Sequence, residues 1–239
     1  MTSTELYNDL LAYCQANVNE ANILKYQRYF KEVHNAYGLD TQQMNDKTAE
    51  LLNKGLTLEV VLEALSEKLI FGKFEEVAFG ISFIGKLSKQ WNAETFDAIA
   101  GLFSKGIHNW AHADILGMNL LPDFILKGIV KPEVFNSWLI SPYKFQRRCV
   151  PVSFIKIIKK EKEVEQYLDF IRPLMTDNER EVHQGVGWFL REAWKIQPEK
   201  TEEFLLEWKN ISSRLIFQYA CEKMTPEGKL KFKADKKTK

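Results

Sequence analysis

Hydrophobic positions recur every three or four residues through nearly the whole chain, which is the spacing of one face of an α-helix. No stretch shows the sustained alternation of apolar and polar residues that predicts a β-strand. Pairs of amphipathic helices are predicted over residues 57–68 with 74–89, and over 164–175 with 180–194. Asp177 and Asn178 are expected to cap the last of these helices. The pattern therefore predicts an all-α fold.

The predicted helix pairs return at steps of 32 to 38 residues. Their expected starts are Thr57, Glu94, Pro132, Val164 and Glu199. Helix pairs that cannot bury their apolar faces alone are typical of an α-solenoid, one curved domain with a concave binding face. We expect this single domain over residues 1–228 and a lysine-rich, frayed tail over 229–239. A compact irregular helical bundle is the alternative.

Composition and charge narrow the class of protein. Of 239 residues, 45% are hydrophobic and 27% charged, as in soluble globular proteins. Thirty-three basic and 32 acidic residues leave a net charge of +1, so any electrostatic site must be local. The longest apolar stretch, residues 77–85, is too short to span a membrane. Residues 1–6 have no basic start followed by an apolar core, so we expect no export. The 3 cysteines are widely spaced, as expected of free thiols, and we expect a cytoplasmic protein.

Two motifs that resemble ligand sites have simpler explanations. Residues 80–86 have the glycine and lysine spacing of a phosphate-binding loop, but Leu87 stands where Ser or Thr is needed, and the segment lies inside a helical pattern. Small residues in helix packing explain it better. His108 and His112 have zinc-ligand spacing, yet no glutamate follows the first, and the helix is expected to begin only around Asn109. We interpret them as polar surface histidines and expect no metal site.

Two tryptophans are predicted to lie beside charged residues on their helices. On the helix over 180–194, Trp188 is about 200° around the axis from the apolar position Val186, which places it on a polar face with Arg191. It either binds a ligand or packs on a neighbouring repeat. Trp110 and Asp114 are four residues apart, so they share one helical face. An aromatic platform beside an acid suits a cationic or sugar-like group, and a polar surface is the alternative.

The most basic stretch inside the fold carries six positive charges before Glu161. They belong to Lys144, Arg147, Arg148, Lys156, Lys159 and Lys160. Such a cluster can hold phosphates, and the alternative is a solvated face. Pro151 is expected in the first turn of a helix opened by the two arginines, where an anionic partner would relieve their unfavourable interaction with the helix dipole.

Taken in order along the chain, these residues resemble the DNA alkylation repair family, the AlkD-like DNA glycosylases built from HEAT-like repeats. The shared pattern is Asn-Trp-Ala-His-Ala-Asp at 109–114, Phe-Gln-Arg-Arg at 145–148 and Gly-Val-Gly-Trp-Phe-Leu-Arg-Glu at 185–192. A further match is Lys-Tyr-Gln-Arg-Tyr-Phe-Lys at 25–31. The resemblance covers almost the whole chain, and the segment at 185–192 is its most specific part.

The resemblance implies excision of cationic N3- or N7-alkylated purines from duplex DNA, by hydrolysis of the glycosidic bond. It implies that Asp114 stabilises the oxocarbenium-like sugar and positions the attacking water. Trp110 and Trp188 would pack against the deoxyribose and backbone at the lesion. Because a cationic alkylpurine already leaves readily, one carboxylate suffices and no metal or organic cofactor is implied.

The resemblance also assigns the DNA contacts. Arg148 would bind a phosphate next to the lesion, with Arg147, Lys156 and Arg191 as further contacts and Tyr29 on the same concave surface. A net charge of +1 then requires a basic concave surface balanced by acidic residues elsewhere. We expect a monomer whose partner is DNA containing alkylated bases. A non-catalytic solenoid that binds DNA or protein is the alternative.

Overall fold

The computed structural model describes residues 1–235, and over this range every regular element is a helix. The prediction of an all-α fold of packed helix pairs is confirmed. Contacts between residues divide the chain into two compact units, Met1–His108 and Asn109–Lys239. The boundary falls next to Asn109, the residue expected to begin a helix.

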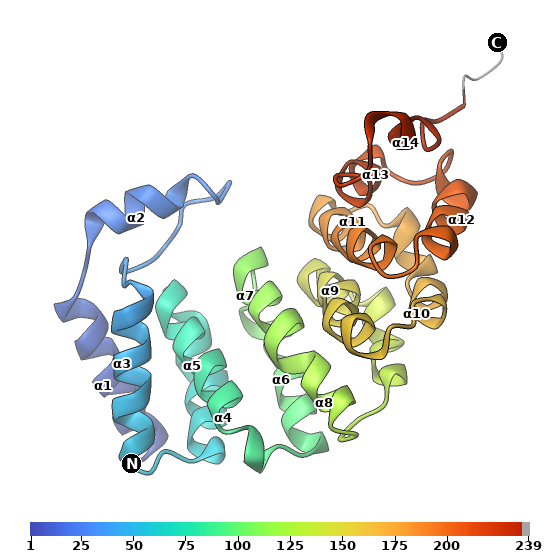
Figure 1. Ribbon diagram of the computed structural model, residues 1–239. Coiled ribbons are helices and arrows are strands. Elements are labelled where there is room, and N and C mark those ends of the chain that lie inside the picture. The colour runs from blue at the N-terminus through green and yellow to red at the C-terminus, as the bar shows by residue number, and fades with distance from the viewer. Residues whose placement is uncertain (236–239) are drawn as a thin grey trace. The chain divides into compact units, whose positions relative to one another are not determined.

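The first unit contains six α-helices. They are α1 (Ser3–Ala16), α2 (Glu20–Gln27), α3 (Thr41–Asn53), α4 (Leu58–Glu67), α5 (Phe74–Lys86) and α6 (Ala93–Lys105). Helix α5 packs against α1, α3 and α4 (Figure 1), and the fully buried Phe79 and Phe83 on α5 form the centre of this core. The predicted pair over 57–68 and 74–89 corresponds to α4 and α5.

The phosphate-loop-like segment over residues 80–86 lies entirely within α5, as the helical pattern predicted. A Cβ atom added to Gly80 would lie 2.6 Å from Cδ1 of Leu65 on α4. The absence of a side chain at Gly80 therefore allows α4 and α5 to approach closely. The interpretation of this motif as helix packing is confirmed.

Two buried glutamates begin α5 and hold the loop that precedes α3. Glu75 accepts hydrogen bonds from the backbone N–H groups of Tyr37, Gly38 and Leu39 at 2.8, 2.7 and 3.2 Å. Glu76 accepts from the Tyr37 hydroxyl at 2.9 Å. Both carboxylates are only 3% exposed, and the three amides replace the water that burial removes. These contacts fix the chain near Gly38, whose φ of 83° lies in the left-handed region that favours glycine.

The second unit contains the remaining α-helices. They are α7 (Trp110–Ile115), α8 (Leu121–Leu126), α9 (Lys144–Glu161), α10 (Glu165–Phe170), α11 (Arg180–Trp194), α12 (Pro198–Trp208), α13 (Arg214–Ala220) and α14 (Pro226–Leu230). A π-helical segment, Leu116–Leu120, joins α7 to α8. Helix α11 packs against both α9 and α13 (Figure 1), burying Val182, Val186 and Phe189 of its apolar stripe.

The prediction that Pro151 opens a helix is wrong, because α9 begins at Lys144 and the proline lies well inside it. Proline has no backbone N–H, so the helix loses one internal hydrogen bond at this point. The residues around it, Val150, Val152 and Phe154, are fully buried. Burial of this segment therefore outweighs the local preference of proline for a first turn.

The described part of the expected frayed tail is packed on the second unit. The side chain of Phe232 is 1% exposed, and its carbonyl accepts a hydrogen bond from Nη1 of Arg214 at 2.9 Å. Asp235 accepts from Nζ of Lys209 at 2.7 Å. One buried aromatic side chain thus anchors the lysine-rich segment over 229–235. Residues 236–239 of the expected tail lie outside the described residues.

Candidate functional site

Asn109 caps α7 and orients the residues that follow it. Its Oδ1 accepts from the backbone N–H of His112 at 2.9 Å, and its Nδ2 donates to ring Nδ1 of His112 at 2.8 Å. Trp110 begins the helix at 37% exposure, and Asp114 lies one turn later on the same face. The predicted helix start is confirmed. The prediction of a surface histidine at 112 is wrong, because this ring is 2% exposed and packs against the cap.

The guanidinium of Arg148 holds Asp114 at both carboxylate oxygens. Nε donates to Oδ1 and Nη2 to Oδ2, each at 2.8 Å, and Nη1 donates to the carbonyl of Glu181 at 2.6 Å. The side chain of Arg148 is 7% exposed and that of Asp114 16%. A two-point contact of this kind fixes both the position and the plane of the carboxylate. The arginine expected to bind a phosphate is therefore directed at the acid.

Close packing of α9 against its neighbours surrounds this pair. A Cβ atom on Gly185 would lie 3.1 Å from Cγ of Arg148, so the missing side chain makes room for the arginine stem. The Cys149 thiol donates to the carbonyl of Ala113 at 3.1 Å, a second link between α9 and α7. Burial, and then the charge of Asp114, raise the pKa of this thiol well above its usual value. Cys149 is therefore a neutral donor in the packing rather than a nucleophile.

Trp188 lies on the face of α11 that contacts α9. It is half-buried, and it shares this face with Gly185 and Glu192, three residues before and four residues after it. Gly185 contacts Arg148, and Glu192 contacts Lys159 of α9. The polar face predicted for Trp188 is thus the side of α11 that meets α9, and the tryptophan lies between these two contacts.

Arg147 has a different partner from its neighbour. Its Nε and Nη2 donate to Asp177 at 2.6 and 3.2 Å, and Nη1 donates to the carbonyl of Ser141 at 2.6 Å. Asp177 also accepts from the backbone N–H of Glu179, the residue before α11. The predicted cap at Asp177 or Asn178 is therefore wrong, since Asp177 holds α9 to the start of α11 instead.

Of the other predicted DNA contacts, Lys156 and Tyr29 lie at the surface, whereas Arg191 is 18% exposed. Lys156 is 41% exposed and pairs with Asp123 at 2.7 Å. Arg191 pairs with Glu222 and with Glu192, the latter at 3.3 Å. Tyr29 belongs to the first unit, where it is 54% exposed and accepts from Nη2 of Arg28 at 2.6 Å. The structure thus brings Asp114 and Arg148 together. Arg147 does not join this pair, because its guanidinium contacts Asp177.

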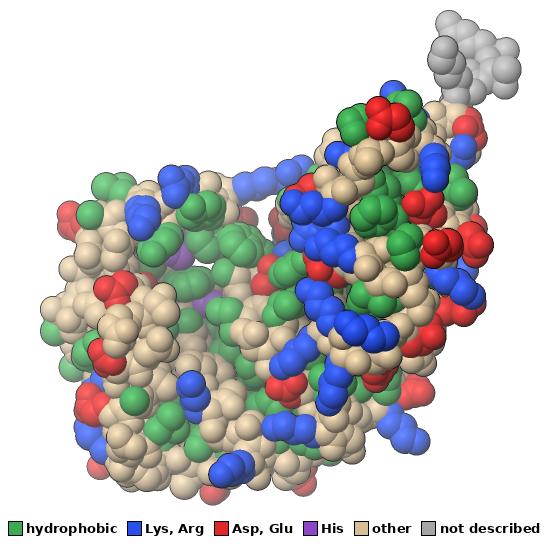
Figure 2. All heavy atoms as spheres, in the orientation of Figure 1, with side chains coloured by type: hydrophobic (Ala, Val, Ile, Leu, Met, Phe, Trp, Pro, Cys, Tyr) green, Lys and Arg blue, Asp and Glu red, His purple; other side chains and the backbone are tan. Residues whose placement is uncertain are grey.

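A buried acid in α11, Glu192, gathers three cations. It accepts from Lys195 at 2.8 Å and pairs with Lys159 at 2.9 Å and Arg191 at 3.3 Å. Burial raises the pKa of Glu192, but the two lysines outweigh burial and lower it to about 2. Figure 2 shows Lys and Arg side chains gathered over α9 and α11. In the sequence, Lys195 lies at helical spacing from Glu192 and Arg191 is its direct neighbour, but no spacing identifies Lys159, the lysine supplied by α9.

The sequence model of the family described as DNA alkylation repair enzyme matches residues 10–224. The chain belongs to this family. The suspected resemblance is thereby confirmed, and membership in the family indicates a role in the repair of alkylated DNA, with DNA as the substrate. A search of curated proteins gives no match. Among the helices of residues 1–235, none is both long and apolar enough to cross a membrane.

Proposed function

We propose that this protein is a DNA-3-methyladenine and 7-alkylguanine DNA glycosylase, which hydrolyses the N-glycosidic bond of cationic alkylpurines in duplex DNA. The observation that carries the proposal is the Asp114 carboxylate, held at both oxygens by Arg148 and one helical turn from an exposed Trp110. A carboxylate fixed in this way keeps a lone pair on each oxygen for a further partner. Such a fixed charge can stabilise a developing cation without reorganising during the reaction.

The chemistry follows from the charge of the damaged base. As the C1′–N bond breaks, its electron pair moves to the cationic purine, which leaves as a neutral molecule. The sugar becomes oxocarbenium-like, and the charge of Asp114 stabilises it. The oxygen of a water molecule then bonds to C1′, and Asp114 accepts one of its protons. The products are a free alkylpurine and an abasic site.

The two tryptophans position the sugar in this scheme. Trp110 offers an apolar surface one turn from the acid, and Trp188 offers a second from α11. Aromatic faces pack against the apolar side of a deoxyribose and exclude water from it. They would keep C1′ near Asp114 while leaving one side open for the attacking water.

The cations divide into two groups. Arg148 is a positioning residue that acts through Asp114, since its guanidinium is nearly enclosed and three of its nitrogens donate within the protein. Arg147 holds the start of α11 in the same manner. Lys156 keeps a surface position from which it can contact a phosphate, as does Tyr29 in the first unit. Arg191 is 18% exposed, and a phosphate would reach it beside its acidic partners.

The test is release of 7-methylguanine and 3-methyladenine from methylated duplex DNA by the wild type and Asp114→Asn. The variant keeps the shape of the side chain but loses its charge, so we expect DNA binding to persist and excision to fall at least about 100-fold. Asp169→Asn is the matched control, because Asp169 also pairs with an arginine, Arg172 at 2.9 Å, but on the exposed surface of the second unit.

Each outcome separates the candidates. Release by wild type and control, but not by Asp114→Asn, supports the glycosylase and its carboxylate together. Equal loss of binding and excision in Asp114→Asn would contradict the catalytic role. Salt-sensitive DNA binding by the wild type, without release of either base, would favour a non-catalytic DNA-binding solenoid.

A further inference from the structure

Lys159 and Lys195, which pair with the buried Glu192, have no role in the function proposed above. We propose that Lys159, Arg191 and Lys195 form a phosphodiester-binding site for one strand of DNA, organised by the buried carboxylate of Glu192. The proposal rests on the proposed function for its ligand, a DNA strand that carries the lesion. It assigns Lys159 and Lys195 as phosphate contacts and Glu192 as their positioning residue.

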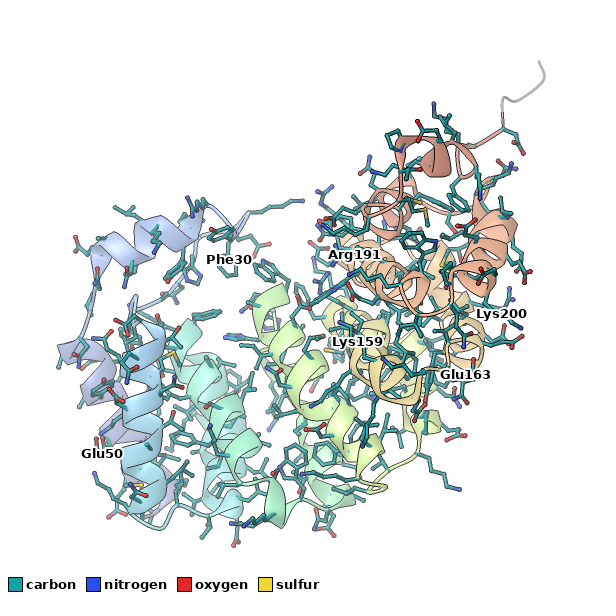
Figure 3. The ribbon with its side chains drawn as sticks, in the orientation of Figure 1. Phe30, Glu50, Lys159, Glu163, Arg191 and Lys200 are labelled. Atoms are coloured by element: carbon teal, nitrogen blue, oxygen red, sulfur yellow. The ribbon has the colours of Figure 1, made fainter. Side chains whose placement is uncertain are left out.

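The geometry is that of a built cation cluster. The side chain of Glu192 is 8% exposed, whereas those of Lys159 and Lys195 are 50% and 42% exposed. One donor of each ammonium group binds the acid, and the others remain available at the surface. Figure 3 shows Arg191 and Lys159, which come from neighbouring helices. Cations from two helices thus converge on one buried anion.

The cluster contains more cations than a purely structural ion pair requires. One carboxylate balances one of the three cations, and Glu222, which contacts Arg191, also pairs with Lys223 at 3.0 Å. The cluster therefore keeps an excess of positive charge at the surface. Long lysine side chains lose conformational entropy when a ligand immobilises them. Glu192 restrains both lysines before DNA arrives, which reduces that loss.

The cluster also lies along the same sides of α9 and α11 as Arg148 and Trp188 of the proposed catalytic site. Trp188 and Glu192 are four residues apart on α11, and Lys195, the helical C-cap residue three positions after Glu192, extends the same stripe. Lys159 follows Arg148 by three turns of α9, about 16 Å along the helix. At about 3.4 Å per nucleotide along a duplex, a strand with its lesion at Asp114 would reach the cluster within about five nucleotides.

The test uses a short duplex that contains one tetrahydrofuran abasic analogue and one neutral methylphosphonate linkage. The linkage is moved in turn through about five positions on each side of the analogue. Binding is measured for the wild type, Lys159→Met and Lys195→Met over a range of salt concentrations. Lys200→Met is the matched control (Figure 3), since Lys200 is 47% exposed and pairs with Glu165 at 2.8 Å.

We expect each cluster variant to weaken binding severalfold and to reduce the slope of log K against log salt by about 0.9, because one phosphate contact is lost. At one linkage the methylphosphonate should remove the difference between wild type and variant. The control should match the wild type at every linkage. Unchanged slopes, or a variant effect that is the same at all linkages, would overturn the proposal.

Glu192→Gln tests the positioning role. We expect it to keep overall affinity for DNA, since it removes a negative charge, but to abolish the dependence of the Lys159→Met effect on a single linkage. If that dependence survives, Glu192 does not organise the site. These binding readouts are independent of base release. Excision without linkage dependence would refute only the phosphate site, and linkage dependence without excision would refute only the glycosylase.

Discussion

The contact between Asp114 and Arg148 can be tested by removing each partner and then both. Arg148→Met deletes the two bonds to Asp114 and the bond to the carbonyl of Glu181, while keeping an unbranched stem that packs on Gly185. It leaves a carboxylate that is 16% exposed without its cation. If Arg148 acts through Asp114, the variant should lose stability and excision but keep its phosphate contacts.

The expected magnitude follows from the bonds that are lost. Two charge-assisted hydrogen bonds contribute about 1.5 kcal/mol each, so Arg148→Met should lower the free energy of unfolding by about 3 kcal/mol. This is the low end for a broken buried pair, because Asp114 retains some contact with solvent. The double variant with Asp114→Asn removes both charges, and we expect about 2 kcal/mol less destabilisation than the sum of the single variants.

The assay is urea unfolding of the four proteins, together with the salt dependence of their binding to undamaged duplex DNA. We expect the coupling just described and a salt slope for Arg148→Met equal to that of the wild type. Additive losses of stability, with a slope reduced by about 0.9, would show that Arg148 binds a phosphate. That result would refute the positioning role.

Two further predictions concern α11. Gly187→Ala should lower the free energy of unfolding by about 1–3 kcal/mol in urea, because the added Cβ would lie 2.5 Å from Cβ of Tyr219 and 2.7 Å from the carbonyl oxygen of Ile216. Gly101→Ala, with nothing within 4 Å, is the control and should be neutral or stabilising; equal effects would contradict the packing argument. The pKa of Glu192 is lowered from 4.5 to about 2, so its ionised form contributes stability above pH 4.5 that is lost as the pH falls toward 2. Wild type should therefore exceed Glu192→Gln by up to about 3 kcal/mol near neutral pH, and the two should converge in acid; a pH-independent difference in urea unfolding would contradict it.

Much of the helical structure could be predicted because it depends on local spacing. The helix over 180–194 has the predicted bounds, and its stripe of Val182, Val186 and Phe189 is buried. The errors occurred where tertiary contacts outweigh local preference. Pro151 is accommodated inside α9 by burial on both sides of it, and Phe232 anchors a segment whose lysines alone indicated disorder.

The candidate site could be predicted only in part. The shared face of Trp110 and Asp114 follows from their spacing in one helix. The partner of Asp114 lies 34 positions away on another helix, and no spacing rule identifies it. Buried acids present the same difficulty, since Glu75 and Glu192 stand among charged or polar neighbours and resemble surface residues until the packing of other helices is known.

The π-helical segment between α7 and α8 sets the direction of Asp123 relative to Asp114. Asp114 and Asp123 are nine positions apart, and on an unbroken α-helix nine steps of about 100° would place them on opposite sides. The wider π turn accommodates one extra residue and so turns α8 back by about 100°. Both aspartates reach α9, one at Arg148 and the other at Lys156. Deleting one residue from Leu116–Leu120 would leave eight regular steps of about 100°, the same relative direction, so the extra residue and the π turn offset each other and both contacts could still form.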